Sequence, residues 1–147
     1  MSETPGMEQR LSLITLGVSD IARARRFYVE GLGWRPSAVS NDDVVFIQLN
    51  GMALSLYSRK ALAEDAGVSP KGDGFMGFAL AYNVREKHDV ESILNLAAQA
   101  GGTIIKPAQE TFWGGYSGYF KDPDGFLWEV AHNPGFQLTK EGHCILP

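Results

Sequence analysis

A segment rich in aromatic residues and glycine is the part of the sequence best suited to contact a small molecule. Residues 112–119 read Phe-Trp-Gly-Gly-Tyr-Ser-Gly-Tyr. The segment lacks Gly-Lys-Ser/Thr and no predicted helix follows it, so it is unlike a phosphate-binding loop. Aromatic rings spaced by glycines suit a planar ligand, and tyrosine hydroxyl groups can orient it. We therefore expect Trp113, Tyr116 and Tyr119 to contact a ligand at a pocket mouth, unless the loop instead plugs its own end of the fold.

The residue types that most often form metal centres and nucleophilic sites are few and scattered. Cys144 is the only cysteine, which excludes a disulfide within the chain and any site built from several cysteines. His88, His132 and His143 show no metal-binding spacing, and no Ser-His-Asp arrangement can be read, so we expect structural or surface roles for the histidines. A single cysteine also fits a reducing compartment, and we expect a cytoplasmic protein.

Length and composition describe one soluble globular domain and exclude several classes of partner. The chain has 147 residues, of which 44% are hydrophobic and 20% charged, close to the average of globular proteins. A net charge of -4, with no basic cluster interleaved with aromatic residues, argues against nucleic acid as a partner. The sequence has no apolar run long enough to span a membrane and no apolar leader segment, so we expect neither membrane association nor export.

The pattern of apolar residues predicts a first unit of strand, helix and three strands. Residues 10–19 alternate as a strand does, and Asp20 can cap a helix that ends near Gly31 and Gly33. Residues 44–49 and 52–57 favour strands, and Asn50-Gly51 between them suits a type I′ hairpin turn. A short strand at 34–39 is expected to lie at an edge because Pro36 interrupts it.

A second unit with the same order of elements follows. Residues 75–82 read as a strand, and Asn83 with Glu86 resembles the capping box of a helix whose apolar stripe runs to Gly101-Gly102. Three further strands are predicted at 103–106, 116–120 and 126–132, with a tight turn at Asp122-Pro123-Asp124-Gly125 between the last two. Repetition of one order of elements is typical of a duplicated fold. The expected layout is a first module at about 10–58, a loop at 59–74, a second module at about 75–132 and a tail at 133–147.

Two sequence segments within these units resemble the vicinal oxygen chelate superfamily, which includes glyoxalase I, extradiol dioxygenases, fosfomycin-resistance enzymes and bleomycin-resistance proteins. One segment is ITLGVSDIARARRFYVEGLGW at residues 14–34, and the other is GYFKDPDGFLWEV at residues 118–130. The resemblance implies an α+β fold in which two tandem βαβββ modules form an open, barrel-like mixed sheet. The helices then lie outside and a ligand pocket lies inside.

The resemblance also implies four strand positions that supply metal ligands in catalytic members. These positions correspond to Leu13, Ser55, Gly77 and Glu129 in this sequence. Leucine and glycine offer no donor atom, a serine hydroxyl is a weak ligand, and tight binding of Fe, Mn, Ni or Zn needs several nitrogen or oxygen donors. We therefore expect no metal cofactor.

Without a metal ion, the four positions describe an apolar pocket with a single carboxylate, that of Glu129. The period of a strand places Leu127 and Ala131 on the same face as Glu129, and Trp128 and Val130 beneath the helices. Glu129 can then act as a proton acceptor or donor, or can simply be satisfied by a neighbouring hydroxyl group. The ligand-binding residues that we expect around it are Leu13, Ser55, Tyr57, Gly77, Trp113, Tyr116 and Tyr119.

Three classes of function remain. The leading hypothesis is a metal-independent small-molecule-binding protein that either sequesters an apolar or aromatic compound or catalyses proton transfer through Glu129. The alternative is a divalent-metal-dependent lyase or isomerase of the glyoxalase I kind, with ligands from unexpected positions. A purely structural or interaction module would be favoured if side chains filled the pocket. The resemblance further implies a homodimer in which modules of two chains complete the pockets.

Overall fold

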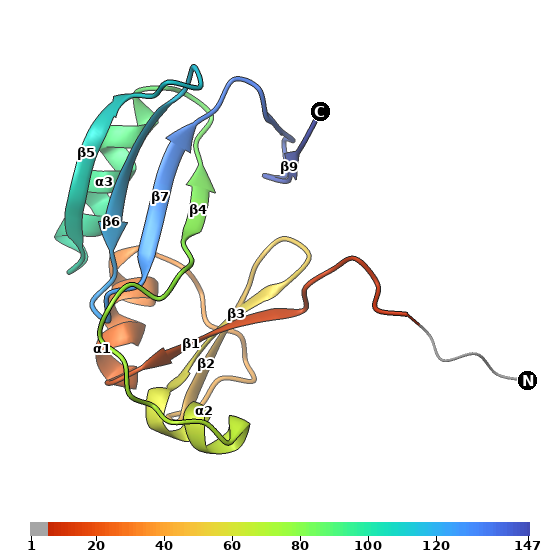
Figure 1. Ribbon diagram of the computed structural model, residues 1–147, viewed down its shortest axis with the longest axis vertical. Coiled ribbons are helices and arrows are strands. Elements are labelled where there is room, and N and C mark those ends of the chain that lie inside the picture. Colours follow the sequence, from red (N-terminus) through yellow and green to blue (C-terminus); the bar gives the residue numbers. More distant parts are fainter. Residues whose placement is uncertain (1–5) are drawn as a thin grey trace, which may run out of the picture.

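Residues 6–147 are described by the computed structural model, in which two mixed sheets are connected by a long linker (Figure 1). The α+β class predicted from the sequence is confirmed, and the sheets do not close into a barrel. No helix in this part of the chain is both long and apolar enough to cross a membrane. The elements are β1 (Leu13–Val18), α1 (Ile21–Arg25), η1 (Arg26–Gly31), β2 (Val44–Gln48), β3 (Ala53–Ser58), α2 (Arg59–Ala66), β4 (Leu80–Asn83), α3 (Asp89–Gln99), β5 (Thr103–Glu110), β6 (Tyr116–Lys121), β7 (Leu127–His132), β8 (Gln137–Leu138) and β9 (Cys144–Ile145).

The first sheet has the order β1-β3-β2, with β1 parallel and β2 antiparallel to the central strand β3. Alternation places Leu54 and Leu56 of β3 in the core, each at most 1% exposed. The hairpin predicted at Asn50-Gly51 is confirmed. Its turn is not type I′, because Gly51 has a φ of 78° whereas no described non-glycine residue has a positive φ.

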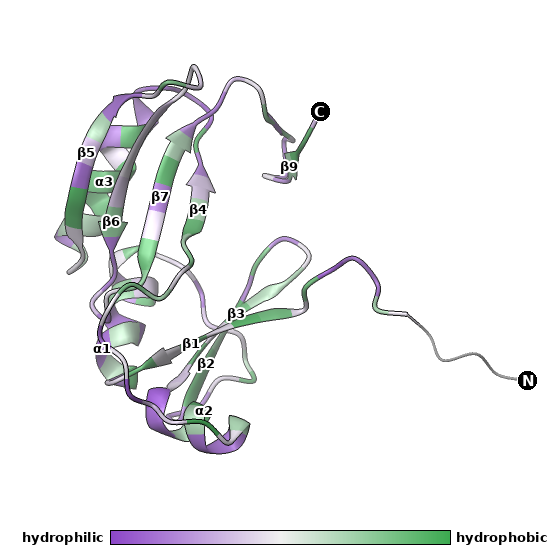
Figure 2. Cartoon of the chain, viewed as in Figure 1, coloured by the Kyte–Doolittle hydropathy of each residue, from purple (hydrophilic) through white to green (hydrophobic). Residues whose placement is uncertain are grey.

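The second sheet repeats this arrangement with one more strand, in the order β4-β7-β6-β5. β4 is parallel to β7, and β6 is antiparallel to both β5 and β7. Helix α3 covers one face of β5, β6 and β7 (Figure 1). Figure 2 shows the reason, because hydrophilic and hydrophobic bands alternate along α3. Val90, Leu94 and Ala97 form its buried stripe.

The helix of the first module changes its geometry halfway along. Asp20 caps it as predicted, because its side chain accepts a hydrogen bond from the backbone N–H of Arg23. The first turn is α-helical, and residues 26–31 then form a π-helix, η1. Phe27 and Tyr28 lie in η1 and are at most 1% exposed, so this segment buries the largest side chains of the helix.

Those two rings connect the modules. Phe27 lies 6.2 Å from Phe120 of β6, and Tyr28 lies 6.2 Å from Trp128 of β7, measured between ring centroids. Trp34, just after the helix, makes an edge contact with Trp128 at 6.0 Å. One continuous apolar core therefore runs from the first sheet through η1 to the second sheet.

Four segments differ from the sequence-based expectation. The edge strand expected at 34–39 does not form; only the Ser37 N–H bonds to the carbonyl of Phe46, as a strand there would. The loop expected at 59–74 contains α2, which Ser58 caps through Ala61 N–H. The strand expected at 75–82 begins only at Leu80. The expected capping box is absent because Asn83 stays in β4 and α3 starts at Asp89.

The C-terminal tail folds back on the chain as a small hairpin of β8 and β9. Asn50 Nδ2 donates to the carbonyl of Glu141, and Arg85 Nη2 donates to the carbonyl of Lys140. These bonds attach the hairpin to both modules, because Asn50 lies in the β2–β3 turn and Arg85 follows β4. The tail therefore lies on its own chain rather than extending into solvent.

Candidate functional site

Glu129 lies at the middle of β7, on the face of the second sheet that α3 does not cover. Its neighbours Trp128 and Val130 are 6% and 0% exposed, as the alternation predicted, while Glu129 itself is half-buried. Tyr119 stands directly opposite on β6, and its hydroxyl group donates to Glu129 Oε2 at 3.3 Å. This bond gives the carboxylate one neutral donor and leaves its other oxygen available.

An open hollow of about 520 Å³ surrounds this carboxylate. The second sheet provides its floor, the loop after β5 one wall and the C-terminal hairpin another. Most of the lining is apolar or aromatic, which is typical of small-molecule sites. The lining residues are Ala81, Tyr82, Asn83, Trp113, Glu129, Ala131, Asn133, Phe136, Leu138, Gly142 and Cys144, and we call this space the Glu129 hollow.

The hydroxyl group of Tyr119 is held in its protonated form. Partial burial raises the pKa of Tyr119, and the negative charge and hydrogen bond of Glu129 raise it further. Tyr119 therefore serves as a hydrogen-bond donor beside the carboxylate across the physiological range of pH. A ligand in the hollow would meet a donor and an acceptor side by side.

The aromatic loop contributes one ring to the Glu129 hollow. Trp113 lines it and remains 40% exposed, whereas Phe112 points into solvent and is fully exposed. Gly114, with a φ of 89°, provides the left-handed residue that the turn at Thr111–Gly115 requires. The chain thus reverses tightly and presents the indole of Trp113 at the rim.

Tyr116 lies on the opposite face of β6 from Tyr119. Its hydroxyl group donates to Glu91 of α3, and the ammonium group of Lys87 sits 4.8 Å from the centre of its ring. The hydrogen bond to Glu91 raises the pKa of Tyr116, so this group too stays protonated. The structure does not bring Tyr116 together with Glu129, because the two side chains lie on different faces of the sheet.

The remaining expected ligand-binding residues lie apart from the Glu129 hollow within this chain. Leu13 is 48% exposed at the start of β1. Ser55 is 3% exposed in the centre of the first sheet, and Tyr57 is half-buried near the end of the same strand. Gly77, with a φ of 78°, lies in the linker before β4. Of the expected set, only Glu129, Tyr119 and Trp113 come together.

The donor set at the four family positions does not fit a divalent metal ion. A leucine side chain, a glycine, a buried serine hydroxyl and one carboxylate supply a single strong oxygen ligand. Within residues 6–147, no three His, Cys, Asp or Glu side chains lie close enough together to hold a metal ion.

Sequence reasoning did not find the tail side chains that complete the hollow. Phe136, Leu138 and Cys144 reach it only because the tail folds into the β8–β9 hairpin. The apolar residues of the tail were the available signal, since an apolar side chain in a terminal segment usually packs against something. Nothing in their spacing indicates which surface they cover.

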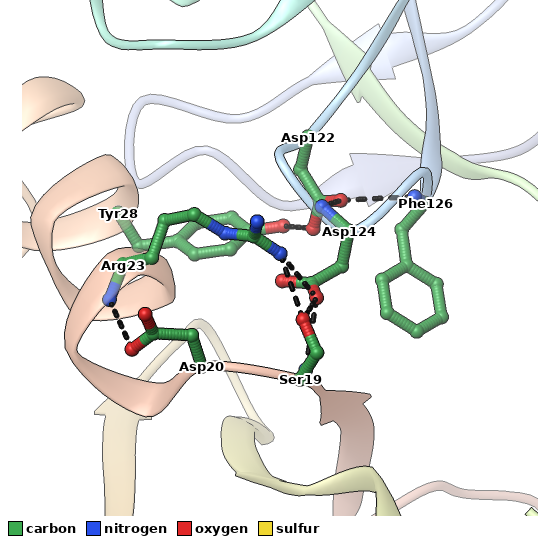
Figure 3. Close-up of polar contacts among 7 residues, drawn as sticks. All are labelled: Ser19, Asp20, Arg23, Tyr28, Asp122, Asp124 and Phe126. Carbon is green, nitrogen blue, oxygen red and sulfur yellow. Dashed lines mark hydrogen bonds and ion pairs between the residues drawn. The ribbon is translucent and has the colours of Figure 1, made fainter.

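A buried polar cluster, which we call the module junction, sets how the first helix meets the second sheet (Figure 3). Asp122 is 4% exposed and accepts hydrogen bonds from Tyr28 Oη at 2.7 Å and from the N–H groups of Asp124 and Phe126, both at 2.9 Å. Asp124 Oδ1 accepts from Arg23 Nη2 at 2.8 Å and from the backbone and hydroxyl of Ser19. The turn predicted at residues 122–125 is thus also the bridge between the modules.

Two ionisable groups of the module junction have raised pKa values. Burial raises the pKa of Asp122, although its hydrogen bonds from Tyr28, Phe126 and Asp124 act in the opposite direction. Burial and the charge of Asp122 raise the pKa of Tyr28 well above its ordinary value. The side chains of the junction come from the first helix and the β6–β7 turn, and none of them lines the Glu129 hollow, so we assign the junction a structural role.

Comparison with known proteins places the chain in one family. A sequence model described as the Glyoxalase/Bleomycin resistance protein/Dioxygenase superfamily matches residues 10–130. The search of curated proteins found no significant match. A solved structure of a glyoxalase-related enzyme from Fulvimarina pelagi is 37% identical, covers 94% of this chain and 98% of its own, and superposes with a TM-score of 0.85.

More distant structures share the fold alone. A glyoxalase/bleomycin resistance protein/dioxygenase family enzyme from Burkholderia phytofirmans PsJN is 20% identical, with a TM-score of 0.73, and the match covers 82% of this chain and 96% of that one. A lactoylglutathione lyase from Agrobacterium tumefaciens is 19% identical, with a TM-score of 0.65, and the match covers 86% and 96% of the two chains. These similarities support the architecture and carry no information about the substrate.

Proposed function

This chain belongs to the Glyoxalase/Bleomycin resistance protein/Dioxygenase superfamily, and on that premise we propose that it binds an apolar or aromatic small molecule against Glu129 without a metal ion. The observation that best supports this proposal is the half-buried carboxylate of Glu129, which has one neutral hydrogen-bond donor, Tyr119, and opens into a largely apolar hollow. A carboxylate with a free oxygen at the wall of such a hollow can accept a hydrogen bond or a proton from a bound molecule.

The hollow suits two activities that share the same contacts. A sequestered aromatic compound would stack against Trp113 and donate a hydroxyl or N–H hydrogen bond to Glu129. A carbon acid would instead transfer a proton from carbon to Glu129, which then returns it to a neighbouring carbon, so that the carboxylate is regenerated. In that case Tyr119 would donate to the oxygen on which negative charge develops.

A homodimer would bring further expected residues to this face. We propose that the first sheet of a second copy covers the exposed face of the second sheet with its Leu13 and Tyr57, whereas Ser55 stays buried within its own chain. Exposed Leu13 supports this arrangement, because an apolar side chain in an open sheet favours burial against a partner. A cytoplasmic location completes the proposal and rests on the single, exposed cysteine.

The proposal is tested by titrating 2-naphthol into the protein by isothermal calorimetry, since this planar compound carries one acidic hydroxyl group. We expect binding by the wild type and about tenfold weaker binding by Glu129→Gln, because the variant keeps the shape but loses a charge-assisted hydrogen bond. The matched control is Glu64→Gln on α2, an exposed carboxylate far from the hollow in the fold, which should leave binding unchanged.

Two results would contradict the proposal. Equal binding by the wild type and Glu129→Gln would remove the carboxylate from the site. Elemental analysis that finds about one Ni, Zn, Fe or Mn ion per chain, lost in Glu129→Gln, would favour the metal-dependent lyase of the glyoxalase I kind instead.

A further inference from the structure

A second hollow lies at the end of the second sheet where the linker from α2 crosses it. Its volume is about 390 Å³, and it is lined by the linker, by α2 and by the β6–β7 turn. In Figure 1 this linker passes the lower ends of β6 and β7 on its way to β4. We call the space the Arg59 hollow; its lining residues that matter here are Arg59, Asp73, Phe75, Phe78, Lys121 and Leu127.

Two cationic side chains in the Arg59 hollow have no carboxylate partner among residues 6–147. Arg59 uses its Nε and Nη2 to bond the neutral carbonyls of Pro70 and Gly72, at 2.8 and 3.1 Å. Lys121 is exposed and forms no ion pair within the described chain. The positive charges of both side chains are therefore uncompensated by direct contact.

The acidic residues at the same hollow do not cancel this charge. The Asp124 side chain is 7% exposed, and its Oδ1 is already bound by Arg23. Asp73 is exposed in the linker and makes no ion pair within residues 6–147. Two cations thus face one unpaired carboxylate, and the hollow carries a net positive charge within a chain whose net charge is -4.

Apolar side chains beside these cations are unusually exposed. Phe75 is 78% exposed, Phe78 is 41% exposed and Ile105 is 45% exposed. Exposed apolar side chains that gather at one hollow, rather than scattered singly, are typical of a surface that a ligand or a partner covers. The Arg59 hollow therefore combines a positive end with an apolar wall.

The Arg59 hollow and the Glu129 hollow lie on one face of the same pair of strands. Lys121 pairs with Leu127 across β6 and β7, and Tyr119 pairs with Glu129 next to them. Residues two apart in a strand point the same way and lie about 7 Å from each other. A molecule of modest length that lies along β7 could therefore contact both Lys121 and Glu129.

We infer that the ligand is an amphipathic organic anion, whose carboxylate, sulfonate or phosphate group binds between Arg59 and Lys121 while its apolar body lies on Phe75 and Phe78 and extends along β7 toward Glu129. This inference deepens the proposed function by naming the class of ligand. The anionic group supplies the charge that the two cations lack, and the body buries the exposed rings.

The test uses two dyes that differ in one anionic group. 8-Anilinonaphthalene-1-sulfonate carries the sulfonate, and N-phenyl-1-naphthylamine has the same rings without it. We expect the wild type to bind the sulfonate more tightly, and Lys121→Gln and Arg59→Gln each to weaken that binding about fivefold without affecting the uncharged dye. Added salt should reduce the difference between the dyes. Lys60→Gln, the neighbouring exposed cation on α2, is the control and should bind both dyes as the wild type does.

Several outcomes would contradict the inference. Equal binding of the two dyes, or no binding of either, would show that the anionic group finds no site. If Lys60→Gln weakened binding of the sulfonate dye as much as Lys121→Gln does, the effect would come from the overall charge of the protein and not from a site at the Arg59 hollow. An unchanged melting temperature of Lys121→Gln shows that this variant is folded. If Arg59→Gln disturbs the linker, the dye binding of Lys121→Gln alone tests the inference. If Lys121→Gln loses binding of the sulfonate dye while Glu129→Gln binds it as the wild type does, the anion site at the Arg59 hollow would be supported. Contact between the ligand and Glu129 would then be refuted.

Discussion

Asp122 illustrates how one side chain can serve a turn and a module contact together. One oxygen accepts the N–H groups of Asp124 and Phe126, which closes the turn, and the other accepts the hydroxyl of Tyr28, which comes from the other module. Trp128 Nε1 in turn donates to the oxygen of Tyr28 at 3.1 Å. Because each of these groups provides the hydrogen-bond partner of the next, removal of one acceptor leaves a buried donor without a partner.

We predict that Asp122→Asn destabilises the protein by about 1 to 3 kcal/mol, because the amide NH₂ replaces an acceptor opposite the Tyr28 hydroxyl. The effect should depend on pH. Burial raises the pKa of Asp122 in the folded state, so protonation of this carboxyl group stabilises the folded protein. This stabilisation is present at low pH and is lost as the pH rises through the raised pKa. The destabilisation should therefore be larger near pH 4 than at pH 7, as measured by urea unfolding.

Asp42→Asn is the control for this measurement, since Asp42 is exposed in the loop before β2. It should change the free energy of unfolding by less than about 0.5 kcal/mol. A destabilisation by Asp122→Asn that shrinks on acidification would mean that hydrogen bonds, rather than burial, dominate the ionisation of Asp122.

At the scale of elements, the close approach of η1 to the end of α3 fixes the distance between the modules. A Cβ placed on Gly31 would lie 2.4 Å from the Cβ and 3.0 Å from the Cα of Ala100. The second of these atoms belongs to the backbone, so it cannot rotate away. Glycine is required here because two backbones meet, and not because of an unusual φ angle.

We predict that Gly31→Ala lowers the free energy of unfolding by about 1 to 3 kcal/mol, because the added methyl group forces η1 away from α3. Gly74→Ala is the matched control, since a Cβ there meets no atom within 4 Å. That change should be neutral or stabilising by up to about 1 kcal/mol through the unfolded state. Chemical denaturation of the three proteins side by side measures both effects, and equal stabilities would contradict the close contact.

The elements that the sequence predicts well are those whose signals are local. Asp20 at a helix start, Asn50-Gly51 in a hairpin and the buried Trp128 and Val130 follow from capping, turn and strand-period rules. The failures have tertiary causes. Asn83 would cap a helix by local preference, but pairing of β4 with β7 keeps it in a strand.

The candidate site shows the same contrast between local signals, which the sequence reveals, and tertiary contacts, which it does not. Alternation along β7 is enough to orient Glu129, and pairing of two predicted strands is enough to place Tyr119 near it. The tail residues Phe136 and Cys144 could not be placed, because hairpin docking depends on Asn50 and Arg85 in distant segments. Tyr116 was assigned to the ligand by its sequence neighbours, yet it faces Glu91 on α3.

At the scale of the whole molecule, each main sheet ends in two strands that pair on one side only within residues 6–147: β1 and β2 in the first sheet, and β4 and β5 in the second. Of these edge strands, β4 lines the Glu129 hollow. Open edges and exposed apolar faces favour association, and closed twofold dimers are its commonest form.

We therefore predict that the protein is a homodimer at micromolar concentration. Multi-angle light scattering should give a mass twice the 16.1 kDa of one chain. Leu13→Lys should lower the apparent mass at the same concentration, because a charge at this exposed position opposes burial of the first sheet. A mass of one chain for the wild type at all concentrations would require the ligand site to be complete within a single chain.

The aromatic rings that connect the two modules give the molecule a built-in optical signal. Trp34 from the first module and Trp128 from the second lie edge to face at 6.0 Å, and Trp128 stacks on Phe120 with the ring planes 4° apart. Aromatic rings held in a fixed, asymmetric setting give near-ultraviolet circular dichroism, which disappears when specific packing is lost. Because the Trp34–Trp128 contact spans the two modules, its contribution to the near-ultraviolet spectrum would be lost if the modules separated while each kept its own strands and helices. The far-ultraviolet spectrum would then stay unchanged, and the two spectral regions together would distinguish opening of the chain from its unfolding.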